Sequence, residues 1–205
     1  MNNWIKKGIV SVAAVCFAGV AAAQFGGLAN ALPGGSKSAG GVTAESLVKS
    51  YVSGTKYVLA SDAKLLSALG LKDQAAKSEL QANNLTEGAT VGSLEDAVKV
   101  QTESSKQLAE GFDNSKVALD AEGKKAFTLG LVDLAKGITS YSNMSSDVSK
   151  FTPSATSIGG AAGAAMFVVK TLPDTSTNLM NTLKKAVAFA KENKIEVPKE
   201  ATSLL

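Results

Sequence analysis

Histidine and arginine are both absent from this 205-residue sequence, and its one cysteine, Cys16, lies near the N-terminus. Without histidine and with a single cysteine, the chain cannot assemble the usual ligand sets for zinc, copper, haem or iron–sulfur clusters. Nucleophilic Ser-His-Asp and Cys-His arrangements are excluded for the same reason. Because every basic residue is lysine, no arginine fork is present to bind a phosphate or carboxylate at two points. We expect no cofactor and no metal site.

Carboxylates, lysines, hydroxyls and tyrosines remain, which leaves room for an enzyme built on a carboxylate pair or a Ser-Lys dyad. The Ser-x-x-Lys pattern occurs three times in one segment, at Ser46–Lys49, Ser53–Lys56 and Ser61–Lys64. This repetition indicates composition rather than a nucleophile. The oxygen-rich stretch from Asp113 to Glu122 lacks the ligand spacing of an EF-hand calcium loop. We therefore assign no catalytic residue, and an enzyme is the third of our hypotheses.

Residues 1–23 have the layout of a cleavable signal peptide. Lys6 and Lys7 precede an apolar and small-residue run, which ends in three alanines before Gln24. Small residues at this position suit a signal peptidase, and the favoured cut follows Ala23. The alternative is a retained membrane anchor, since the run reaches about the lower length limit for a span. Cleavage predicts a periplasmic or secreted protein.

Removal of residues 1–23 takes Cys16 away, so the mature chain can form no disulfide. It leaves 19 of the 21 lysines to face 18 acidic residues, a balance that gives no electrostatic reason to expect nucleic acid or an anionic membrane as partner. Residues 24–42 are rich in glycine, serine and alanine and predict a flexible arm. Residues 43–205 then form a single domain.

The expected mature start, Ala23-Gln24-Phe25-Gly26-Gly27-Leu28, precedes a Gly/Ser stretch and a helical body. In this layout the chain resembles a loose group of uncharacterised exported proteobacterial α-helical proteins. The resemblance covers the short start and the order of the segments. It implies an envelope or secreted helical protein, and it transfers no function and no site residue.

Apolar residues recur at helical spacing through most of residues 43–205 and strand signals are poor, so we predict an all-α fold, an up-and-down bundle of four to six helices. Residues 101–107 are strongly polar and predict a surface helix. Pro173 is expected to end one helix and Asp174 or Thr175 to open the last. The expected helices run from Thr43 to Gly70, Asp73 to Leu85, Ser93 to Gly111, Asp120 to Tyr141, Ile158 to Leu172 and Thr175 to Asn193, before an extended tail from Ile195 to Pro198.

The segment after Ile158 is the candidate site. Gly159 and Gly163 are small residues four apart, and Ala165, Met166 and Phe167 follow. Small residues at this spacing let helix backbones approach closely. We interpret the segment as a close-packed helix near the bundle centre, and an apolar ligand cleft beside it is the alternative.

The export signal, near-neutral charge and missing catalytic residues favour a non-enzymatic binding or interaction protein of the bacterial envelope. Its partner would be an apolar small molecule held between helices or another envelope protein. The second hypothesis is a structural or membrane-interacting envelope protein, which would use residues 25–32 or 158–169. Membrane association is the weaker of these expectations, because both segments are too short to span a bilayer.

Overall fold

The computed structural model describes residues 42–113, 118–152 and 160–205. The predicted signal peptide and arm therefore lie outside the described residues, apart from Val42. The described residues form six helices and no strand, which confirms the all-α bundle. The helices are α1 (Ala44–Ala68), α2 (Lys72–Asn84), α3 (Val91–Asp113), α4 (Ala121–Lys150), α5 (Gly160–Glu192) and the short α6 (Lys199–Thr202).

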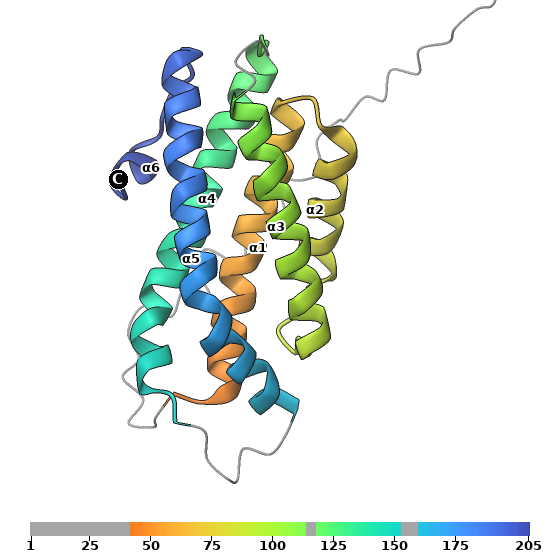
Figure 1. The fold of residues 1–205 in the computed structure, drawn as a ribbon, viewed down its shortest axis with the longest axis vertical. Coiled ribbons are helices and arrows are strands. Elements are labelled where there is room, and N and C mark those ends of the chain that lie inside the picture. Colours follow the sequence, from red (N-terminus) through yellow and green to blue (C-terminus); the bar gives the residue numbers. More distant parts are fainter. Residues whose placement is uncertain (1–41, 114–117, 153–159) are drawn as a thin grey trace, which may run out of the picture. The chain divides into compact units, whose positions relative to one another are not determined.

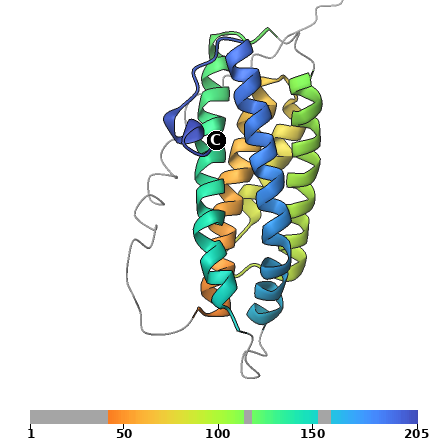
Figure 2. The same cartoon turned by 60° about the vertical axis from the view of Figure 1, so that its left-hand side comes forward.

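The five long helices alternate in direction. Helices α1, α3 and α5 run one way, and α2 and α4 return between them (Figure 1). Helix α1 is the central element, because it packs against each of α2, α3, α4 and α5. Turning the molecule shows α1 behind α5, with α4 and α3 on either side (Figure 2). The prediction that the glycine- and alanine-rich segment occupies the centre is therefore wrong.

Close backbone packing occurs between α1 and α4. A Cβ atom added at Gly54 would lie 2.6 Å from Cε1 of Tyr141, and one added at Gly137 would lie 2.6 Å from Cγ2 of Val58. The Ser61 hydroxyl donates a 2.8 Å hydrogen bond to the carbonyl of Gly130 across the same contact. The glycines of α1 and α4 thus provide the close approach that the sequence analysis assigned to Gly159 and Gly163.

Two of the predicted helix starts are confirmed in detail. Thr43 is the N-cap of α1, and its side chain accepts a hydrogen bond from the amide of Ser46. Asp120 caps α4 by accepting from the amide of Gly123 at 2.7 Å. After α1, Gly70 takes a positive φ of 81°, a backbone conformation that costs glycine little because it has no Cβ.

The predicted start at Ser93 is wrong by two residues. Helix α3 begins at Val91, and Thr90 Oγ1 accepts from the amide of Ser93 at 3.3 Å. Either threonine or serine can provide such a cap, and the sequence offers both within three positions. The extended tail around Ile195 is confirmed, and the short helix α6 after Pro198 was not predicted.

Pro173 does not end a helix. Helix α5 continues through it from Gly160 to Glu192. Proline removes one backbone hydrogen bond from a helix. Pro173 lies on the exposed face of α5, while Leu172, Thr175 and Leu179 continue its buried face. Burial of that face outweighs the local cost of the proline, so the two predicted helices form one.

Candidate functional site

The structure does not bring the predicted site residues together. Gly159 lies outside the described residues. Gly163 is exposed, and a Cβ added there would meet Val91 Cγ2 at an ordinary contact distance of 3.5 Å. Ala165 is fully buried, Phe167 is half-buried and the Met166 side chain is 49% exposed. The start of α5 is therefore buried on one side and exposes apolar or small residues on the other.

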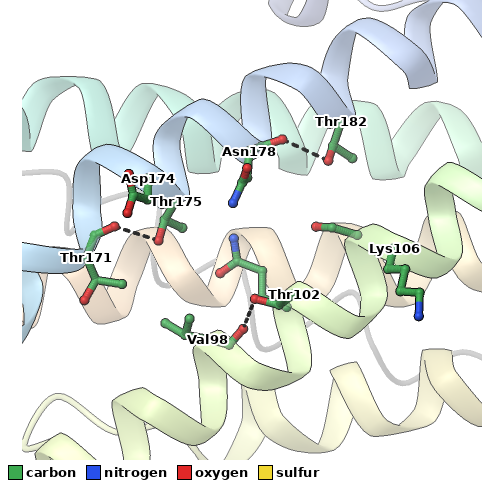
Figure 3. A pocket seen from close by; sticks show the side chains of 10 residues that line it. Val98, Thr102, Lys106, Thr171, Asp174, Thr175, Asn178 and Thr182 are labelled. Atoms are coloured by element: carbon green, nitrogen blue, oxygen red, sulfur yellow. Dashed lines mark hydrogen bonds between the residues drawn. The ribbon is translucent and has the colours of Figure 1, made fainter.

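A groove of about 350 Å³ lies between α3 and α5 (Figure 3). Nine of its ten lining residues have polar side chains, from both helices, while apolar carbon atoms make up the larger part of its surface. Helix α3 contributes Val98, Gln101, Thr102, Ser105 and Lys106, and helix α5 contributes Thr171, Asp174, Thr175, Asn178 and Thr182. None of these residues was predicted to form a site from the sequence.

The threonine hydroxyls of the groove share one hydrogen-bond pattern. Each donates its proton to the carbonyl four residues earlier in its own helix, at 2.8 Å for Thr102, 2.6 Å for Thr171, 2.9 Å for Thr175 and 3.0 Å for Thr182. Three of these bonds are visible in Figure 3. A hydroxyl whose proton is used in this way keeps lone pairs to accept with. Toward the groove, these four side chains therefore act as hydrogen-bond acceptors.

Gln101 is the most buried polar side chain of the α3 wall, with 4% exposure. Its Oε1 atom finds no hydrogen-bond donor within the described part of the chain. A buried amide oxygen without a partner costs about 1–3 kcal/mol of folding stability, so a hydrogen-bond donor would stabilise this atom. The predicted surface position holds for Thr102, Glu103 and Lys106, which are exposed. It is wrong for Gln101 and Ser104, which belong to one buried stripe with Leu94, Ala97 and Leu108.

Charged side chains of opposite sign border the groove. Asp174 lies at one end and Lys106 at the other (Figure 3), and both are exposed. Among the described residues, neither forms an ion pair with another side chain. Each charge is therefore available to a bound molecule.

A layer of buried tyrosines lies beneath the α5 wall. The rings of Tyr51 and Tyr141 stack with centroids 5.2 Å apart, and Thr55 Oγ1 lies 2.7 Å from the Tyr141 hydroxyl. Burial raises the pKa of Tyr51, and its hydroxyl has no hydrogen-bond partner among the described residues.

Asp62 lies deeper in the core and does not line the groove. It is 1% exposed, and neither carboxyl oxygen has a hydrogen-bond partner among residues 42–113, 118–152 and 160–205. Desolvation by burial raises the pKa of its carboxyl well above the usual value. Its negative charge would also raise the pKa of Tyr141, so the two groups lie close enough to interact.

Neither a metal-binding cluster nor a membrane-spanning helix occurs among the described residues. Within the described ranges, no three or more acidic, histidine or cysteine side chains gather closely enough to hold a metal ion. Of the helices in the described residues, none has the length and apolar character needed to cross a membrane. The α3–α5 groove remains a candidate site in the described part of the chain.

No protein-family model, no curated protein and no solved structure matches this chain. The class that the fold defines is an all-α helical bundle, and the groove between two parallel helices is the feature from which function can be argued.

Proposed function

We propose that this protein is an exported, non-enzymatic binding protein of the bacterial envelope that holds a small polar ligand between α3 and α5. The export part of the proposal rests on the signal-peptide pattern of residues 1–23. The binding part rests on the groove and its lining. The proposed ligand is polar, whereas the sequence analysis named an apolar small molecule or another envelope protein, because nine of the ten residues that line the groove are polar.

The amide of Gln101 is the single observation that carries the binding proposal. A groove position that is 4% exposed normally holds an apolar side chain or a polar one with its partners satisfied. The Oε1 atom has no donor in the described chain, although it belongs to a residue that lines a groove. Because this oxygen is closed to solvent in the structure, a ligand N–H or O–H group would supply the missing hydrogen bond after the Gln101 side chain turns toward the groove.

Native mass spectrometry of the protein recovered from producing cells tests the proposal. We expect a chain that begins at Gln24 and retains a small polar molecule, which Gln101→Leu releases. A variant that should keep the molecule is Gln107→Leu, since Gln107 lies on the same helix and does not line the groove. Recovery of a bare chain, or of a molecule that both variants retain, contradicts the assignment of the groove.

A further inference from the structure

We propose that the ligand of the α3–α5 groove is an organic ammonium compound, a small molecule with a protonated amine that donates several N–H hydrogen bonds. This inference rests on the proposed binding function and specifies the ligand class of the same site.

Four threonine hydroxyls give part of the groove an acceptor character, beside the donors of Ser105, Lys106 and the amide nitrogens of Gln101 and Asn178. The hydroxyls of Thr102, Thr171, Thr175 and Thr182 all donate to backbone carbonyls and present acceptor lone pairs only. The Gln101 oxygen, which has no donor in the described chain, adds a buried acceptor. A ligand that donates protons can satisfy these acceptors, whereas a ligand made only of acceptors, such as a phosphate or sulfate, would leave them without a hydrogen bond and could bind only the groove's donors.

The carboxylate of Asp174 places a negative charge beside the threonine acceptors of the groove. Asp174 is on the same helix as Thr171 and Thr175 and lies beside them in Figure 3. A carboxylate next to hydroxyl acceptors attracts a cation with N–H donors, because hydrogen bonds between charged groups are stronger than neutral ones. A neutral polyol would fill the acceptors and leave the carboxylate without a counter-charge.

Lys106 limits the charge of the ligand. Its ammonium group lies at the end of the groove away from Asp174 (Figure 3) and disfavours a second positive charge at that end. The ligand therefore has one ammonium group, followed by a neutral tail or a carboxylate. A simple amine alcohol and an amino acid share this ammonium chemistry, and Lys106 distinguishes them because it pairs only with a carboxylate.

The test uses NMR titration of the whole protein with four probes. Ethanolamine and glycine have an N–H-bearing ammonium group. Tetramethylammonium has the charge without N–H donors, and ethylene glycol has the hydroxyls without the charge. We expect saturable binding of ethanolamine or glycine, at least tenfold tighter than binding of either control probe. Equal binding of all four probes, or binding of none, overturns the inference.

Substitutions then locate the site. We expect Asp174→Asn to weaken binding of the ammonium probes at least tenfold, while Glu110→Gln, which removes an exposed charge of α3 outside the groove, leaves binding unchanged. Thr175→Val removes one acceptor from the groove and should weaken binding several-fold. Its matched control is Thr177→Val, because Thr177 makes the same bond to Pro173 on α5 and does not line the groove.

The variant Lys106→Gln distinguishes an amino acid from a simple amine as the ligand. Weaker binding of glycine with unchanged binding of ethanolamine indicates an amino acid as ligand, and unchanged binding of both indicates a simple amine. The failure of this inference is distinguishable from that of the proposed function. If native mass spectrometry recovers a neutral or anionic molecule that Gln101→Leu releases, the ammonium assignment is wrong and the binding function stands.

Discussion

Asp62 and Gln101 are buried polar side chains with oxygens that find no hydrogen-bond partner in the described residues. They differ in what surrounds them, because Gln101 lines the groove and Asp62 lies in the core. A buried carboxyl without a partner avoids the cost of a buried charge by keeping its proton. We therefore treat Asp62 as a feature that affects stability and Gln101 as part of the binding site.

Asp62 should make the protein less stable as the pH rises from about 4 toward neutrality. Below about pH 3.9 the carboxyl is protonated in both the folded and unfolded chain and contributes no difference. Above it, the unfolded chain releases the proton while the raised pKa keeps it bound in the folded chain. The free energy of unfolding then falls by about 1.4 kcal/mol per pH unit until the raised pKa is reached.

The variant Asp62→Asn isolates this effect, because the amide has a similar shape and does not titrate. We expect wild type and variant to approach each other in stability near pH 4, and the variant to become the more stable one as the pH increases. Urea unfolding of both proteins between pH 4 and pH 7 measures the difference. A difference that does not change with pH would show that the carboxyl is not held protonated in the fold.

Gln101→Leu should leave the free energy of unfolding unchanged or raise it by about 1–2 kcal/mol while it abolishes ligand binding. The substitution removes a buried oxygen whose missing hydrogen bond costs the fold free energy, and leucine has a similar volume. Thermal unfolding without ligand measures the first effect, and titration with ethanolamine measures the second. A large loss of stability would assign the amide a structural role instead.

The burial of Gln101 could have been predicted from the sequence. Leu94, Ala97, Gln101, Ser104 and Leu108 are spaced by three and four residues, which is the spacing of one helix face. The polar composition of residues 101–107 led to the prediction of a surface position, because the buried residues Gln101 and Ser104 are themselves polar. The groove itself could not have been predicted, since its two walls are 65 or more residues apart in sequence and only the packing of α3 beside α5 brings them together.

At the scale of helices, the caps and most of the lengths follow from local sequence. Thr43 and Asp120 begin α1 and α4 where their side chains can accept from the first turn. The pairing of helices depends on surfaces that local patterns do not reveal. Gly54 is the one glycine of α1, and Gly137 is seven residues from Gly130 on α4, so neither forms a short motif of small residues. Both nevertheless allow close packing between the two helices.

Gly137→Ala should destabilise the protein by about 1–3 kcal/mol, because the added Cβ would overlap Val58 at the α1–α4 contact. Gly163→Ala is the matched control. Its added Cβ makes only an ordinary contact with Val91, and alanine favours a helix over glycine by about 1 kcal/mol. We expect this variant to be as stable as wild type or more so. Chemical denaturation measures the free energy of unfolding of both variants. Equal destabilisation would contradict the assignment of the close contact to α1 and α4.

Pro173→Ala should stabilise α5 by about 1–2 kcal/mol. A proline in a helix interior costs about 3 kcal/mol relative to alanine, and the greater freedom of the unfolded alanine chain offsets part of the gain. The exposed position of Pro173 leaves room for the replacement without repacking. Thermal unfolding measures the change. A loss of stability would mean that the proline shapes α5 in a way that its neighbours require.

At the scale of the whole molecule, the sequence predicts an all-α up-and-down bundle, which the structure confirms, and an exported binding protein, which remains a proposal. The central position of α1 could not be read from its composition, because α5 has the longer run of small and apolar residues. What decides the centre is how many sides of a helix are buried. Helix α1 packs against each of the other long helices, α2, α3, α4 and α5, whereas the first turns of α5 expose Gly163 and Met166.

The most direct test of this account is a map of the residues whose backbone amide signals shift when ethanolamine is added, measured beside an equal titration with tetramethylammonium. The account predicts saturable shifts that gather on residues 98–106 of α3 and 171–182 of α5, and that tetramethylammonium does not reproduce. Shifts that gather elsewhere on the bundle, or that both compounds cause equally, would contradict the claim that the α3–α5 groove binds a protonated amine.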